Sequence, residues 1–117
     1  MASSSVSLTR EDGRVVCEHL LVAARPLRRM RGLLGRAELP ADEGILLRPA
    51  GAVHTFFMRF PIDVVFLDKE EVVVGIEPDL APWKTAGRRG SKAVVELAAG
   101  ECERRGVQVG DRLRVAA

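Results

Sequence analysis

Short apolar segments separated by turn residues recur along the whole chain, which is the pattern of a β-rich protein. Residues 62–67 (Ile-Asp-Val-Val-Phe-Leu) are rich in β-branched and aromatic side chains and predict a strand. The charged turn at 68–70 leads into a second apolar segment, 71–76, so the pair predicts a hairpin. Further strands are predicted over 14–23, 45–48, 53–58, 93–98 and 113–115.

Two short helices are predicted among these strands. Pro26 suits a first helical turn, and apolar residues follow it at helical spacing, which predicts a helix over 26–36. A second helix is predicted to open at Gly100 and to be capped by Gly106, with acids near its start and arginines near its end. The chain therefore predicts a mainly β fold, a compact β-sandwich or barrel-like domain with one or two short α-helices.

The segments between these elements predict turns and loops. The dipeptide Asp12-Gly13 is a hairpin signal ahead of the strand at 14–23. Residues 78–90 contain two prolines and two glycines and predict a loop, which carries the only tryptophan, Trp83.

The composition fits one soluble domain. The chain has 117 residues, of which 47% are hydrophobic and 29% charged, with a formal net charge of +2. We expect a flexible, serine-rich stretch over residues 1–10 and a single domain over 11–117. No apolar segment approaches the roughly 18 residues of a membrane helix, and the first residues lack a secretory signal, so a cytoplasmic location is expected.

The cysteines predict neither a disulfide framework nor a metal site. Cys17 and Cys102 are far apart in sequence, and no further ligand set of metal-site spacing accompanies them. In a strand, Cys17 and His19 share a face, and we interpret them as a small buried thiol beside a half-exposed histidine. No metal and no cofactor is expected.

The densest group of unusual side chains lies between Val53 and Asp63. Asp63 shares a strand face with apolar residues, and a buried ionised acid needs partners, which Arg31, Arg59, His54 or backbone N–H groups could supply. The functional interpretation is a shallow pocket that holds a small polar ligand near His54 and Asp63. Its candidate residues are His54, Phe57, Met58, Asp63, Trp83 and Arg31.

Other interpretations of the same residues remain open. Asp63 could cap a turn or pair with an arginine, and His54 could donate to a carbonyl. An enzyme would use His54 and Asp63 as an acid/base pair, although no nucleophile motif surrounds Ser91 or Thr55. Carbohydrate is one candidate ligand, by analogy with sandwich folds alone.

The arginine-rich face of the helix at 25–36 could instead bind nucleic acid or a protein partner. The small net charge and the lack of aromatic residues between these arginines argue against nucleic acid. The oligomeric state is not determined by the sequence.

An ordered set of motifs resembles the DUF192 family, also called UPF0127, of small bacterial and archaeal proteins. The motifs are Arg31-Gly32-Leu33-Leu34-Gly35-Arg36, Leu39-Pro40-x-x-x-Gly44, Phe57-Met58, Pro61-Ile62-Asp63-Val64-Val65-Phe66-Leu67-Asp68, Val95-Glu96-Leu97-x-x-Gly100 and Gly106-Val107-x-x-Gly110-Asp111. The resemblance implies a compact β-rich sandwich with short helices, and it implies no established reaction, ligand or catalytic residue. Many relatives carry tryptophan where this chain has Phe57, and many also carry an export signal.

Overall fold

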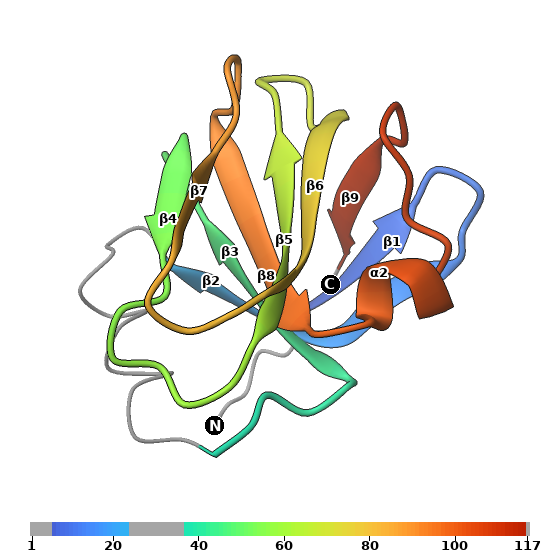
Figure 1. Ribbon diagram of the computed structural model, residues 1–117. Helices are drawn as coiled ribbons and strands as arrows, with labels where there is room; N and C mark the ends of the chain where they lie inside the picture. The colour runs from blue at the N-terminus through green and yellow to red at the C-terminus, as the bar shows by residue number, and fades with distance from the viewer. Residues whose placement is uncertain (1–5, 24–36, 117) are drawn as a thin grey trace.

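The computed structural model describes residues 6–23 and 37–116, whose elements are drawn in Figure 1. The strands, in chain order, are β1 (Val6–Arg10), β2 (Val15–Ala23), β3 (Glu43–Leu47), β4 (Ala52–His54), β5 (Ile62–Leu67), β6 (Val73–Leu80), β7 (Thr85–Gly87), β8 (Ala93–Ala98) and β9 (Leu113–Ala116). In this part of the chain, α2 (Glu101–Arg104) is a short helix between β8 and β9, and no helix there is long and apolar enough to cross a membrane.

The larger sheet has seven strands in the order β6-β5-β8-β3-β2-β1-β9 and curls toward closure (Figure 1). Its neighbouring strands are antiparallel except β2 and β3, which are parallel. The two edges approach each other, because Val72 pairs with Arg112 and the Val73 N–H donates to the Asp111 carbonyl at 2.8 Å. The mainly β, barrel-like fold expected from the sequence is therefore confirmed.

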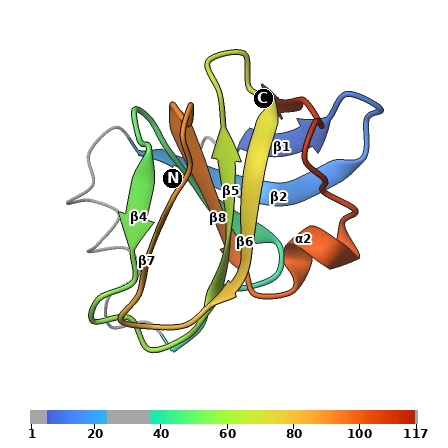
Figure 2. The same ribbon diagram turned by 45° about the horizontal axis from the view of Figure 1, so that its top comes forward.

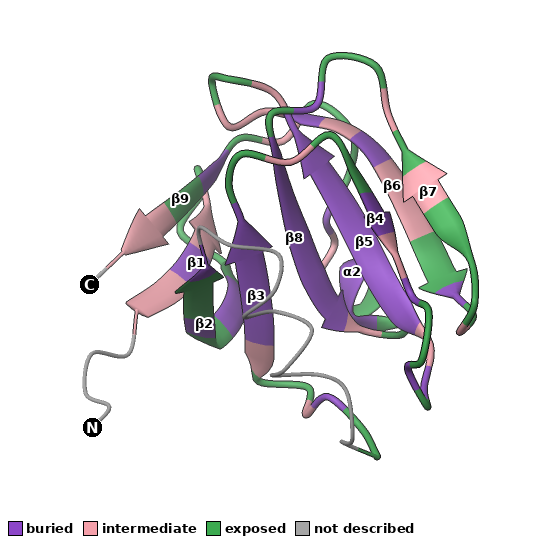
Figure 3. Ribbon diagram, turned by 90° about the vertical axis from the view of Figure 1, so that its left-hand side faces the viewer, coloured by how far each residue is buried: buried purple, intermediate pink, exposed green. Residues whose placement is uncertain are grey.

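The central strands β5 and β8 are buried on both faces, as Figure 3 shows along their length. Alternation along β5 assigns Val65 and Leu67 to an inner core, which side chains of β1, β2 and β9 also line. The same alternation assigns Val64 and Phe66 to a second, outer core on the opposite face. Each fully buried side chain of this size stabilises the fold by about 1.5–3 kcal/mol.

The small sheet of β4 and β7 packs over the outer core (Figure 2). Val53 of β4 is buried there, and Ala86 of β7 packs against the same cluster. Arg88, directly after β7, lies across β6 with its guanidinium 5.2 Å from the ring centre of Phe66 and donates to the Ile76 carbonyl at 3.2 Å. This arginine therefore ties the small sheet to the large one.

The first and last described strands are neighbours. In the β1–β9 ladder Ser7 pairs with Ala116 and Arg10 pairs with Leu113. The expectation of a flexible stretch over residues 1–10 is therefore wrong for Val6–Arg10, because β2 and β9 hydrogen-bond this segment on both sides. Residues 1–5 lie outside the described part of the chain.

The predicted strands 62–67 and 93–98 match β5 and β8, and the short helix after Gly100 is confirmed. Two predictions are corrected. The strand expected over 53–58 ends at His54, where the chain turns, and the loop expected over 78–90 contains the end of β6 and the whole of β7. The predicted helix over 26–36 lies outside the described residues.

Packing around Gly44 gives a test of this architecture. A Cβ at Gly44 would lie 2.9 Å from Leu97 Cδ2, 3.0 Å from Cys17 Sγ and 3.2 Å from the Glu96 carbonyl oxygen. We expect Gly44→Ala to lower the free energy of unfolding by about 1–3 kcal/mol in urea titrations, since overpacking strains the core. Gly51→Ala is the control, because its Cβ would only reach the Ser91 carbonyl oxygen at 3.4 Å. Equal stability of the two variants would contradict this packing.

Candidate functional site

Asp63 anchors two backbone segments inside the barrel. It is 1% exposed and shares its face of β5 with Val65 and Leu67 of the inner core. Its Oδ1 accepts the Asp79 N–H at 2.8 Å, and its Oδ2 accepts the Cys102 N–H at 2.9 Å. The carboxylate therefore fixes the end of β6 and caps α2, whose own N-cap residue, Gly100, provides no side-chain hydrogen bond.

The structure does not bring His54 and Asp63 together. Asp63 faces the inner core, whereas His54 ends β4, the strand that packs over the outer core. The central sheet lies between these two positions, and both Asp63 oxygens are held by backbone N–H groups. Of the partners predicted for Asp63, the backbone N–H groups are the ones observed, and the acid/base pair is not assembled.

Four rings form an exposed aromatic cluster at the β4–β7 end of the molecule. We define the aromatic cluster as His54, Phe56, Phe57 and Trp83. The ring centres of His54 and Phe56 are 4.9 Å apart, those of Phe56 and Trp83 are 5.9 Å apart, and those of Trp83 and Phe57 are 4.6 Å apart. Phe57 and Trp83 remain 61% and 59% exposed, so most of their surface faces water.

Thr55 holds the two loops of the aromatic cluster together. Its side chain is fully buried, its hydroxyl donates to the Ala81 carbonyl at 2.6 Å, and the same oxygen accepts the Lys84 N–H at 2.9 Å. Its backbone N–H donates to the Lys84 carbonyl, and its carbonyl accepts the Trp83 N–H at 3.0 Å. The hydrogen bonds of one residue thus fix both ring-bearing segments.

Phe57 and Trp83 adopt a backbone conformation that is costly for large residues. Their φ angles are 69° and 66°, in the left-handed region where side chains other than glycine are disfavoured by about 1–2 kcal/mol. Burial of the side chains does not offset this cost, because both remain mostly exposed. Strained residues that point large rings into solvent are typical of a functional surface rather than of a packing requirement.

The other candidate residues divide between the core and the undescribed segment. Met58 is 5% exposed and belongs to the outer core, so its side chain is not part of an exposed binding surface. Arg31 lies outside the described residues. Sequence reasoning omitted Phe56 and Thr55 from the candidates. The crowding of aromatic residues between 54 and 57 was the available signal for Phe56, and no local pattern marked Thr55.

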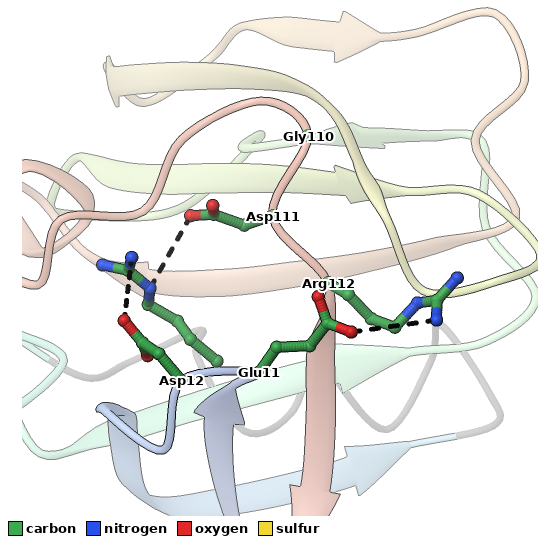
Figure 4. A pocket seen from close by; sticks show the side chains of 6 residues that line it. Glu11, Asp12, Gly110, Asp111 and Arg112 are labelled. Carbon is green, nitrogen blue, oxygen red and sulfur yellow. Dashed lines mark ion pairs between the residues drawn. The ribbon is translucent and has the colours of Figure 1, made fainter.

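A polar cleft of about 220 Å³ lies between the β1–β2 turn and the residues before β9 (Figure 4). Its charged groups are mutually paired. Arg10 bonds to Asp12 at 3.2 Å and to the Gly106 carbonyl at 2.8 Å, and Asp111 accepts the Gln108 N–H at 2.8 Å. We interpret these ion pairs and hydrogen bonds as holding the β1–β2 turn against the loop before β9.

A second charge cluster joins α2 to β2. Arg105 reaches Glu101 at 3.1 Å and Glu18 at 2.8 Å and also donates to the Val15 carbonyl. Hydrogen bonding to Arg105 lowers the pKa of Glu18, and hydrogen bonding to Arg104 lowers the pKa of Glu101. These ion pairs and hydrogen bonds hold α2 against β2.

The thiols are buried and free. Burial raises the pKa of Cys17 to about 11, and burial followed by the charge of Asp63 raises the pKa of Cys102 above its usual range. Cys17 is fully buried while the His19 side chain is 57% exposed, so the predicted burial of the thiol is confirmed, whereas the two side chains do not share one buried face. Among the described residues no group of three or more acids, histidines and cysteines could hold a metal ion.

The role of Asp63 can be tested by removing its carboxylate. Asp63→Ala leaves two N–H groups without their acceptor, and we expect the free energy of unfolding to fall by about 2–5 kcal/mol in urea titrations. Asp63→Asn keeps one acceptor oxygen, so its free energy of unfolding should lie between those of Asp63→Ala and the wild type. Glu70→Gln, at an exposed acid of the β5–β6 turn, is the control and should be neutral. If Asp63→Ala were as stable as the wild type, the anchoring role would be excluded.

The buried thiols predict alkaline destabilisation. Between pH 9 and 11 the unfolded chain has lost the Cys17 proton while the folded protein retains it. The free energy of unfolding should therefore be unaffected by this group below pH 9 and should fall as the pH rises toward 11. Urea titrations of the wild type and Cys17→Ala check this, since the variant should show a shallower decrease. If the free energies of unfolding of the two proteins fell equally with pH, the raised pKa of Cys17 would be refuted.

Comparisons with known proteins agree with this fold. The chain matches the DUF192 family, described as "Uncharacterized ACR, COG1430", over residues 7–115. A UPF0127 protein of Pyrococcus furiosus is 43% identical over 63 residues, which cover 53% of this chain and 53% of that protein. The match thus spans about half the length of this relative.

Two crystal structures are similar over 94% of this chain. A protein of unknown function from Novosphingobium aromaticivorans has a TM-score of 0.78 and 24% identity, with 83% of it covered, which shows a shared fold. A protein from Sinorhizobium meliloti, described as a candidate transcription regulator, has a TM-score of 0.77 and 27% identity, with 91% of it covered. Since the family match extends over nearly the whole sequence, this chain belongs to the DUF192 family.

Proposed function

We propose that this domain is a binding module that takes a small ligand on the aromatic cluster of His54, Phe56, Phe57 and Trp83. The observation that carries the proposal is the pair of exposed rings at Phe57 and Trp83, both on left-handed backbone. Such rings add little to the stability of the fold, because most of their apolar surface stays in water. A ligand with a flat face would bury that surface.

The hydrogen bonds of Thr55 support binding by a preformed surface. Both ring-bearing loops are fixed before a ligand arrives, so little conformational entropy is lost on binding. His54 is also oriented, because its Nδ1 accepts the Phe56 N–H at 3.3 Å. Binding is favoured over acid/base catalysis by His54 and Asp63, since Asp63 faces the inner core and both of its oxygens accept backbone N–H groups.

Trp83 provides a direct readout, because it is the only tryptophan and the chain has no tyrosine. We expect its emission to change when pools of ring-containing ligands, including sugars, nucleotides and aromatic acids, are titrated. Phe57→Gly should weaken the binding so found by about tenfold or more, since one stacking ring is lost. Its free energy of unfolding should stay within about 1 kcal/mol of the wild type, because glycine relieves the strained φ.

The control is Val109→Ala, which removes an exposed apolar side chain from the loop before β9 and should leave binding intact. Thr55→Val should weaken binding while Phe57 and Trp83 are both retained, because the loops lose their hydroxyl contacts. Binding that is unaffected by Phe57→Gly, or amide shifts in NMR spectra confined to other surfaces, would refute the proposal.

A further inference from the structure

We infer that the ligand of the aromatic cluster is a nucleotide unit, either free or within a single-stranded nucleic acid. This inference rests on the proposed function and adds the chemistry of the ligand. Its basis is the combination of stacked, exposed rings with a local excess of positive charge that the net charge of the chain conceals.

The two segments that build the aromatic cluster contain no acid. Residues 49–62 and 80–92 include neither aspartate nor glutamate, while they carry Arg59, Lys84, Arg88, Arg89 and Lys92. The formal net charge of +2 reflects acids elsewhere in the chain. The cations and the histidine in these two segments favour an anionic partner.

Two of these cations are close to the ring residues in sequence. Lys84 follows Trp83, and its N–H is held by the Thr55 hydroxyl at 2.9 Å. Arg59 follows Phe57 by two residues, and both cationic side chains are exposed. Neither forms an ion pair with any residue that the structure describes, whereas Arg88 reaches Glu77 at 3.5 Å. Arg59 and Lys84 are therefore available to neutralise phosphate.

A neutral sugar fits this surface less well. Sugar hydroxyls need hydrogen-bond acceptors and donors at fixed positions, but the two segments carry no carboxylate, and the only side-chain amide of the chain, Gln108, lies in the loop before β9. Bases need only a ring face, and stacking on aromatic side chains is largely independent of base identity. Rings with adjoining cations are the combination used for single-stranded nucleic acid, in which arginine and lysine contact the phosphates.

The aromatic cluster differs from the arginine-rich face at 25–36, for which the sequence disfavours nucleic acid. On the arginine-rich face at 25–36 no aromatic residue interleaves with the cations. Beside the aromatic cluster each exposed ring has a cation nearby in sequence: Arg59 follows Phe57 by two residues, and Lys84 follows Trp83. The inference therefore requires no strongly basic domain, only a short binding site of a few nucleotides.

The test titrates the full chain with an eight-nucleotide oligothymidylate at low salt and follows Trp83 emission. We expect saturable quenching, with log Kd rising with log salt concentration at a slope of about 0.7 for each phosphate neutralised. Arg59→Gln and Lys84→Gln should each reduce that slope by about 0.7. Phe57→Gly should weaken binding by about tenfold while leaving the slope nearly unchanged.

Matched controls separate this site from general charge attraction. Lys69→Gln removes an exposed cation from the β5–β6 turn and should not alter the slope or the affinity. Inorganic polyphosphate carries charge without bases, so it should bind at least tenfold more weakly than the oligonucleotide. Thymidine monophosphate distinguishes the two sources of the ligand: affinity equal to that of the oligonucleotide assigns a free nucleotide, and much weaker affinity assigns a strand.

The outcomes also separate this inference from the proposed function. If a neutral sugar or an aromatic acid quenches Trp83 in a Phe57-dependent manner and the nucleotides do not, the binding module stands and the nucleotide inference is overturned. If polyphosphate competes as well as the oligonucleotide, stacking is excluded and the inference is again overturned. If none of these probes alters Trp83 emission, both fail.

Discussion

The burial of β5 and β8 on both faces is the constraint on which the rest of the structure depends. Because side chains alternate along a strand, every residue of β5 belongs either to the inner or to the outer core. A polar side chain in such a strand cannot reach water and needs hydrogen-bond partners within the protein. Asp63 meets that condition by joining the end of β6 to the start of α2. A residue that looks chemically reactive in the sequence thereby becomes part of the scaffold.

The same constraint explains why the exposed aromatic side chains lie outside the main sheet. The seven-stranded sheet fills both of its faces near β5 and β8, so large side chains without a packing role appear where a smaller sheet overlies it. The loops that follow β4 and precede β7 carry these rings, and Thr55 beneath them is buried and fully hydrogen-bonded. A rigid scaffold with adaptable loops is a common arrangement for binding. Here the loops themselves are fixed by a single polar residue.

The sequence predicted the elements that local patterns determine. The strands at 62–67 and 93–98 and the helix after Gly100 follow from β-branched residues, charge order and a left-handed glycine. The end of β4 could not be predicted, because the turn at Phe57 requires a positive φ that a bulky residue rarely adopts. The ladder between β1 and β9 joins residues more than 100 positions apart, and no local pattern encodes that pairing.

The sequence also indicated some of the candidate site residues, again where a local pattern marks them. Aromatic crowding pointed to Phe57, and Trp83 was singled out as the only tryptophan; the structure brings their rings to 4.6 Å. Grouping His54 with Asp63 failed because alternation determines the face of each residue within a strand but not which strands share a side. Thr55 was not identified because its role depends on the Ala81 carbonyl, 26 residues away.

The pairing of Ser7 with Ala116 has a mechanical consequence. The start of β1 and the end of β9 lie beside each other, so tension between these points pulls perpendicular to the ladder. The hydrogen bonds of β1 and β9 then break one after another, like a zipper, instead of sharing the load as they would in shear. A chain stretched through its ends would lose β9 or β1 at low force, while β5 and β8, which are interior strands buried on both faces, would remain folded longest.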